Sequence, residues 1–104
     1  SNYKNQPDWL WEGTAMFVSK QNDSRMKNKP LKFEEFLDYY NKKGNGVYKE
    51  AGFAVQFLFD KYGKEKLLKL IKSLKDIDSE SKFKDKFEEI YGFNLDYKNF
   101  NTSN

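Results

Sequence analysis

Apolar side chains recur at helical spacing along most of the chain, and this periodicity constrains the fold more than any other feature. No alternation of apolar and polar residues is long enough to indicate a β-strand, whereas separations of three and four residues recur throughout. The 104 residues suffice for one small domain or for part of a larger protein. We therefore predict an all-α fold in which residues 1–104 form a single helical domain or subdomain, a compact bundle of five or six short helices.

Turn-forming residues divide the chain into segments. Helices are predicted at 8–20, 33–41, 47–62, 64–75 and 82–91, with a last short turn at 94–100. Polar connections are predicted at 21–30 and 76–81, and a polar tail at 101–104. Asp8 and Asn94 are the predicted N-caps, and Gly63 and Gly92 stand where helices should end.

Three of the predicted helices have a distinct apolar side. The positions expected to face the core are Val47, Ala51, Ala54, Val55, Leu58 and Tyr62, then Leu67, Leu70, Ile71 and Leu74, then Phe83, Phe87 and Ile90. Phe53 and Phe57 point nearly opposite to the apolar side of their own helix. That helix should therefore lie at the centre of the bundle or contact something beyond this chain.

Lysines gather on the opposite side of the segment around residues 61–72. They are either a solvated helix face or a patch for nucleic acid or an anionic membrane. Asp60 and Glu65 interrupt the lysines, Arg25 is the only arginine, and the net charge of the chain is only +3. We expect a solvated face and no nucleic-acid partner. No apolar run is long enough to span a bilayer, so no membrane partner is expected.

The chain contains no Cys and no His. Disulfides, thiolate metal sites, imidazole metal sites and a complete Ser-His-Asp triad are therefore excluded within it. Any chemistry must use carboxylates, Lys, Tyr or hydroxyl groups, or be completed by residues elsewhere. The missing cysteines fit a bacterial cytoplasmic protein and a secreted one equally. The chain opens at Ser1 without Met, which indicates a cut or engineered start.

Glu12 is the first candidate functional residue. The helix that carries it has apolar residues around almost its whole circumference and should be buried on most sides. A carboxylate in apolar surroundings costs several kcal/mol unless a cation or a metal meets it. A salt bridge to a lysine, or a rim position with the carboxylate in water, is the alternative. Gly13 costs about 1 kcal/mol inside a helix, which indicates that another backbone approaches closely there.

Tyr48 is the second candidate. It begins the helix at 47–62, at the edge of the apolar side and just after a Gly-Asn-Gly turn. A phenol in this position can donate a hydrogen bond into a cleft. The alternative is that Tyr48 is one more aromatic residue of the core.

The segment from Pro7 to Phe17 resembles the "P-x-W-L-x-E-G-x-A-x-[FY]" segment of gluzincin zinc metallopeptidases, the peptidase MA-like group. The segment from Val47 to Ala54 resembles a later helix of that family with the pattern "Y-x-x-(A/G)". The likeness extends to about Phe100. No HExxH motif, which supplies two His ligands and the general-base Glu in that family, is present in this chain.

The resemblance implies that this chain is the C-terminal helical subdomain of a zincin-like fold. Glu12 would be the third zinc ligand and Tyr48 would stabilise the oxyanion during peptide-bond hydrolysis. The missing N-terminal part would carry the HExxH, and Trp9, Phe53 and Phe57 would pack against it. Zinc would be held only in the intact protein, and this chain alone would be inactive. The alternative is a self-standing or degenerate helical module that binds a peptide or protein without catalysis.

Overall fold

The computed structural model describes residues 6–24, 29–38 and 45–101. These residues contain helices and no strand, so the all-α prediction is confirmed for them. No helix in these ranges combines the length and the apolar character that crossing a membrane requires. In chain order the helices are α1 (Asp8–Val18), α2 (Gln21–Ser24), the 3-10 helix η2 (Phe36–Asp38), α3 (Asn45–Tyr62), α4 (Lys64–Ser73), the 3-10 helix η3 (Leu74–Asp76), α5 (Glu80–Tyr91) and α6 (Tyr97–Asn101).

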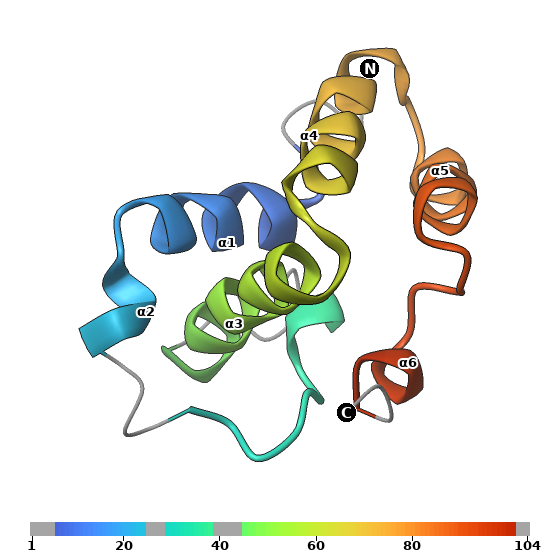
Figure 1. Cartoon of the computed structure of the whole chain (residues 1–104). Coiled ribbons are helices and arrows are strands. Elements are labelled where there is room, and N and C mark those ends of the chain that lie inside the picture. Colours follow the sequence, from blue (N-terminus) through green and yellow to red (C-terminus); the bar gives the residue numbers. More distant parts are fainter. Residues whose placement is uncertain (1–5, 25–28, 39–44, 102–104) are drawn as a thin grey trace.

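Helices α1 and α3 lie side by side and form the largest helix pair of the fold (Figure 1). Gly13 lies at their closest approach. A Cβ at Gly13 would overlap the carbonyl oxygen of Ala51 and would lie 2.6 Å from Cγ2 of Val55. This separation is shorter than real Cβ contacts, so only glycine allows the two helices to pack this closely. The predicted backbone approach at Gly13 is confirmed.

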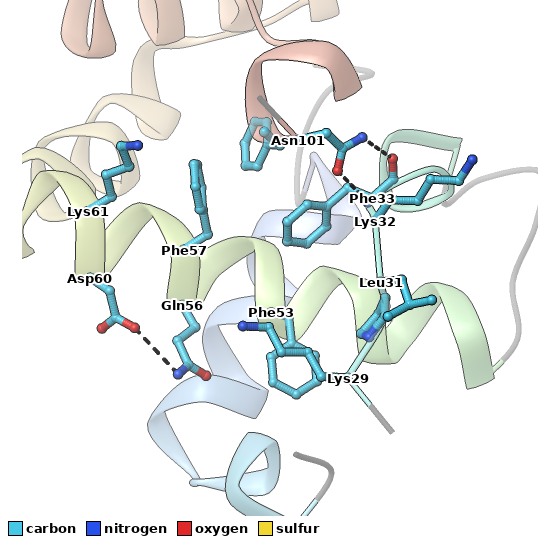
Figure 2. A pocket seen from close by; sticks show the side chains of 12 residues that line it. Lys29, Leu31, Lys32, Phe33, Phe53, Gln56, Phe57, Asp60, Lys61 and Asn101 are labelled. Carbon is cyan, nitrogen blue, oxygen red and sulfur yellow. Dashed lines mark hydrogen bonds between the residues drawn. The ribbon is translucent and has the colours of Figure 1, made fainter. Parts of the chain in front are cut away.

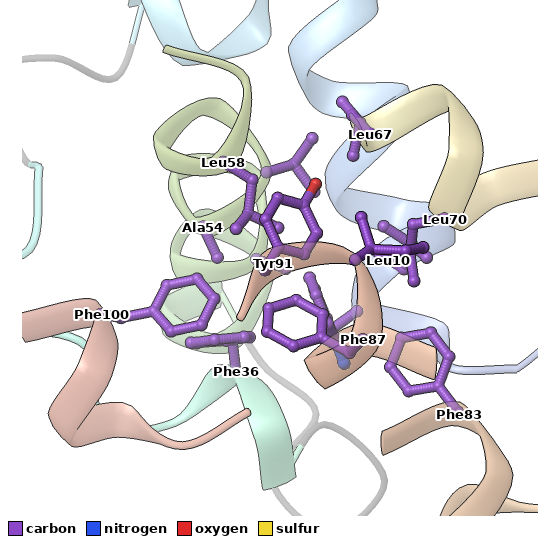
Figure 3. Packing of buried hydrophobic residues seen from close by; sticks show 14 of the residues in the cluster. Leu10, Phe36, Ala54, Leu58, Leu67, Leu70, Phe83, Phe87, Tyr91 and Phe100 are labelled. Atoms are coloured by element: carbon purple, nitrogen blue, oxygen red, sulfur yellow. The ribbon is translucent and has the colours of Figure 1, made fainter. Parts of the chain in front are cut away.

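The core lies between α3 and the helices around it, and it is rich in aromatic rings. Figure 3 shows side chains from α1, α3, α4 and α5 meeting there, together with Phe36 of η2 and Phe100 of α6. Phe36 stands 5.0 Å from both Trp9 and Phe100, measured between ring centroids. The predicted core-facing positions of α3, of α4 with η3, and of α5 are buried or half-buried, which confirms those faces.

The second aromatic strip of α3 is largely covered within this chain. Phe53 is only 2% exposed, and Phe57 packs against Phe33 and Phe100. Trp9 is 3% exposed and lies inside the core. The prediction that Trp9 and Phe53 pack against a missing N-terminal part is therefore wrong, whereas for the half-buried Phe57 it stays a prediction. Phe36 and Phe83 pack against Trp9, Phe33 and Phe100 pack against Phe57, and Lys29 lies over the Phe53 ring. Periodicity along a single helix does not reveal these neighbours.

Several boundaries differ from the prediction. Helix α1 ends at Val18 with Asp8 in its first turn and Pro7 as N-cap, and α2 lies inside the predicted connection at 21–30. Only η2 occupies the predicted helix at 33–41, whose last three residues lie outside the described part. Helix α5 starts earlier than expected, because the Ser79 side chain accepts a hydrogen bond from the Lys82 N–H.

The C-terminal helix also differs from the prediction. Asn94 does not cap α6. Instead the Asp96 side chain accepts a hydrogen bond from the Asn99 N–H at 3.0 Å. Asn101, which was expected to begin the polar tail, is the last residue of α6. The predicted helix ends at Gly63 and Gly92 are confirmed, and both glycines have a positive φ that other residues adopt only with strain.

Candidate functional site

Glu12 lies on the outer side of α1 and is exposed. The prediction of an apolar environment around this carboxylate is wrong, and the rim position that we gave as the alternative is the one observed. Helix α1 has buried residues on one side only, namely Trp9, Leu10, Gly13 and Met16. Because apolar residues surround the whole helix, the sequence could not tell which of them the remainder of the fold would cover.

The exposed side of α1 is unusually apolar. Trp11 is 45% exposed and Val18 is 71% exposed, and Ala15, which lies between them on the helix surface, is exposed as well. Positions 11, 15 and 18 are separated by four and three residues, so they form one stripe along the helix. We call Trp11, Ala15 and Val18 the outer stripe of α1. Glu12 lies beside this stripe, so an exposed carboxylate and exposed apolar side chains are neighbours on this surface.

Tyr48 lies in the first turn of α3 and is half-buried against the core. Counting 100° per residue, it lies on the same side of α3 as Ala51 and Val55, the residues that meet Gly13. Glu12 directly precedes Gly13. Glu12 and Tyr48 therefore belong to the parts of α1 and α3 that pack against each other where the two helices approach most closely.

The chain's own residues do not complete a zinc site. Structural and catalytic zinc sites use three or four protein ligands, with His and Cys prominent. The sequence contains neither His nor Cys, and the described residues hold no cluster of three or more Asp or Glu that could bind a metal ion.

A buried carboxylate does exist, but it belongs to Glu50 and not to Glu12. Glu50 is 2% exposed, and one of its carboxylate oxygens accepts hydrogen bonds from the N–H groups of Glu34, Glu35 and Phe36 at 2.6–2.9 Å. Burial raises the pKa of Glu50 above its ordinary value, and the three N–H donors oppose that shift. Its partners are backbone groups, so Glu50 holds the segment before η2 in place.

Sequence reasoning missed Glu50 as well as Asn22. Glu50 falls at helical spacing between Val47 and Ala54 on the apolar side of α3, which is a signal that could have been noticed. Asn22 is 1% exposed, and its amide donates to the carbonyl of Gly52 at 2.9 Å and to Oε1 of Gln56 at 3.0 Å. These bonds tie α2 to α3, and no local pattern around Asn22 indicates them.

A groove is present on the far side of α3 from α1 (Figure 2). It has a volume of about 710 Å³ and lies between residues 29–33 and the second half of α3. Phenylalanine rings line its apolar part and lysines stand at its edges. Comparisons of the chain with protein families, with curated proteins and with solved structures find no match.

Proposed function

We propose that this chain is the C-terminal helical part of a gluzincin-like zinc metallopeptidase. The proposal rests on the resemblance of the segments from Pro7 to Phe17 and from Val47 to Ala54 to that family, and it is compatible with the exposure of Glu12 beside the outer stripe of α1, where a metal held by another element has access to the carboxylate. Exposed apolar stripes on a helix are typical of surfaces that another structural element covers. In a gluzincin-like protein, the helix with the HExxH motif would cover this stripe and bring its two histidines next to Glu12.

The close packing of α1 on α3 supports the same arrangement. Gly13 lets the segment that carries Glu12 approach the first half of α3, which carries Tyr48. Zinc, when bound, supplies the Lewis-acid chemistry by which a water molecule attacks a peptide carbonyl. Glu12 would hold the metal through a carboxylate oxygen, and the Tyr48 hydroxyl would donate a hydrogen bond to the oxyanion that develops.

The coding sequence upstream of Ser1 provides the first test. An HExxH motif shortly before residue 1 agrees with the proposal, and an upstream sequence without it contradicts the proposal. The second test uses the longer protein that this upstream sequence encodes. We expect zinc content and peptidase activity, both lost in Glu12→Gln, whereas Glu65→Gln, an exposed carboxylate on α4, should leave both unchanged. Retention of zinc and activity by Glu12→Gln would rule the assignment out.

Tyr48→Phe in the longer protein separates the role of Tyr48 from that of Glu12. Removing one hydrogen-bond donor to an oxyanion typically lowers kcat by about 100- to 1000-fold. We therefore expect Tyr48→Phe to lose activity while zinc content stays at the wild-type level. An unchanged kcat would remove Tyr48 from the proposed site without affecting the assignment of Glu12.

The outer stripe gives an independent readout that does not need activity. Trp9 is buried and Trp11 is 45% exposed, so acrylamide quenching of this chain should report mainly on Trp11. If another helix covers the stripe in the longer protein, we expect acrylamide to quench its tryptophan fluorescence no more than that of the Trp11→Phe variant of this chain. Equal quenching in the shorter and longer proteins would show that nothing packs on α1 and would contradict the arrangement.

The second candidate function is a helical module that binds a peptide or protein partner without catalysis. The groove beside the second half of α3 favours it, because concave sites of about 300–1000 Å³ with aromatic linings are the usual form of ligand-binding pockets. An upstream sequence without HExxH, together with a chain that binds a peptide, would support this second function over the first.

A further inference from the structure

Helix α4 and the 3-10 helix η3 concentrate positive charge in one part of the molecule. Residues 64–75 contain five lysines and one glutamate, so this segment has a net charge of +4, whereas the whole chain has +3. All five lysines are exposed, namely Lys64, Lys66, Lys69, Lys72 and Lys75. The segment therefore presents a positive surface to its surroundings.

The structure leaves these five lysines without acidic partners. On the neighbouring helix α5, by contrast, Lys82 pairs with Asp78 at 2.9 Å and Lys84 pairs with Glu80 at 3.5 Å. Glu65 is the one acidic residue of α4, and neither it nor another carboxylate in residues 6–24, 29–38 and 45–101 forms an ion pair with any of the five. Their ammonium groups are therefore available to an anionic partner.

An exposed leucine lies in the middle of this positive surface. Lys64, Leu68 and Lys72 follow one another at intervals of four residues, so they form one row along α4. Leu68 is 41% exposed, whereas Leu67 and Leu70 are buried on the other side of the helix. We call Lys64, Leu68 and Lys72 the α4 row. It faces away from the core and combines two ammonium groups with one apolar side chain.

We propose that the α4 row binds the surface of a lipid bilayer that contains anionic lipids. Clusters of about four to eight basic residues on an amphipathic helix are typical of segments that bind anionic headgroups. The lysines reach the headgroups, and the apolar side chain between them enters the boundary of the acyl chains. The expectation of no membrane partner rested on the missing spanning segment, and binding at the surface requires none.

The residue types of this segment favour a lipid surface over a nucleic acid. Residues 64–75 contain neither arginine nor an aromatic residue. Arginine is preferred for bidentate contacts with phosphate, and aromatic rings provide the surfaces on which single strands stack their bases. A phosphate backbone also offers no apolar surface to Leu68, whereas a bilayer removes this side chain from water.

The expected affinity follows from the charges next to the bilayer. Each lysine near an anionic bilayer raises the affinity by about fivefold, and a glutamate lowers it by a similar factor. Lys64, Lys69 and Lys72 lie on or beside the row, as does Glu65. We therefore expect a preference for anionic over neutral bilayers of at least about 25-fold.

Sedimentation of this chain with unilamellar vesicles tests the proposal. The probe vesicles contain phosphatidylcholine and phosphatidylserine at about 2:1, and the control vesicles contain phosphatidylcholine alone. At about 0.05 M NaCl, half of the protein should bind the probe vesicles at a lipid concentration at least about 25-fold lower than for the control vesicles. At about 0.5 M NaCl the preference should disappear, because the Debye length falls to a few Å.

A charge-matched pair of variants tests the location of the binding surface. Lys64→Gln with Lys72→Gln should weaken binding to the probe vesicles by about 25-fold. Lys29→Gln with Lys32→Gln also removes two exposed lysines, but Figure 1 shows residues 29–35 at the opposite end of the molecule from α4. Because charges beyond the Debye length are screened, this control should change the affinity by less than about twofold.

A second pair of variants tests the apolar contact. Leu68→Ala should weaken binding to the probe vesicles severalfold, whereas Leu31→Ala, at a fully exposed leucine of the 29–35 segment, should not. Glu12→Gln should bind the vesicles like the wild type, which separates this surface from the proposed peptidase site. Circular dichroism confirms that each variant is folded.

Three outcomes would overturn the proposal. They are equal binding to the two kinds of vesicle, equal losses in the two lysine pairs, and tighter binding of an oligonucleotide or of polyglutamate than of the probe vesicles at equal charge concentration. Wild-type affinity of Leu68→Ala would show that the leucine does not enter the bilayer and would contradict the role of the α4 row.

Discussion

Glu50 provides the sharpest test of how this fold is held together. The Glu50→Ala substitution removes the acceptor for three backbone N–H groups. Phe36 is fully buried, and its N–H would be left without a partner, at about 1–3 kcal/mol. Glu34 and Glu35 are more exposed, so their N–H groups can turn to water at about 0.5–1 kcal/mol each. We expect a total loss of about 2–5 kcal/mol in the free energy of unfolding.

Glu50→Gln separates the acceptor from the charge. The amide keeps an oxygen that can accept these hydrogen bonds and removes a charge whose burial is unfavourable. We expect Glu50→Gln to stay within about 1 kcal/mol of the wild type at pH 7. Glu34→Gln, which changes an exposed carboxylate, is the matched control and should change stability by less than about 0.5 kcal/mol.

The pH dependence of the Glu50 effect has a defined sign. Burial, with a smaller contribution from the Glu35 carboxylate, raises the pKa of Glu50 in the native protein above the ordinary 4.5. Between 4.5 and that raised pKa, the native protein binds more protons than the unfolded chain, so stability from this group falls as pH rises through the window. The wild type should therefore gain stability relative to Glu50→Gln as the pH is lowered from 7 toward 4.5.

Urea denaturation followed by tryptophan fluorescence measures all of these effects. Trp9 stands 5.0 Å from Phe36, so its emission reports directly on the segment that Glu50 holds. A Glu50→Ala protein that loses less than about 1 kcal/mol would refute the role of the three hydrogen bonds. An equal loss in Glu50→Gln and Glu50→Ala would refute the separation of acceptor from charge.

Urea denaturation of single variants tests three further contacts, those of Gly13, Asn22 and Ser79. Gly13→Ala should lower the free energy of unfolding by about 1–3 kcal/mol, because the new Cβ would overlap α3, even though alanine has the better helix propensity. The control Gly46→Ala should change it little, because only the end of the flexible Glu35 side chain is near. A stabilised Gly13→Ala protein would contradict the close packing. Asn22→Asp should destabilise more than Asn22→Ala, because a carboxylate would face two oxygens that now accept hydrogen bonds, and the reverse order would contradict the assignment of the amide. Ser79→Ala should lose about 1 kcal/mol through the lost N-cap of α5, and Ser79→Asp should restore it.

The sequence predicted the helices and their buried faces better than it predicted the site. Helical periodicity is a local property, so α3, α4 and α5 could be placed along with the side that each one buries. The close backbone approach at Gly13 was also predictable, because a glycine inside a helix is unfavourable and indicates that a neighbouring group leaves no room for a side chain. The exposure of Glu12 was not predictable, since α1 is apolar all around and only its neighbours decide which side is covered.

Local sequence patterns could not predict the hydrogen bonds that hold the residues on one side of the groove. Glu50 lies 14–16 residues from the N–H groups that it accepts, and Asn101 lies 68 residues from Phe33. Residues 29–35 have no regular secondary structure, so their backbone groups need partners from elsewhere in the chain. Periodicity contains no information about which distant side chain supplies them.

The tie between Phe33 and Asn101 has a consequence for how the protein is synthesised. Phe33 leaves the ribosome long before translation reaches the asparagine that will hold it. Helices α1 and α3 can pair during this interval. The rings of Phe33 and Phe36, however, lack their contacts with Phe100 until α6 has been synthesised. Nascent chains in this condition are prone to misassociation and attract chaperones. We therefore expect protease to cleave ribosome-bound chains stalled before Asn101 next to Phe33 and Phe36, which are half-buried and fully buried in the released protein.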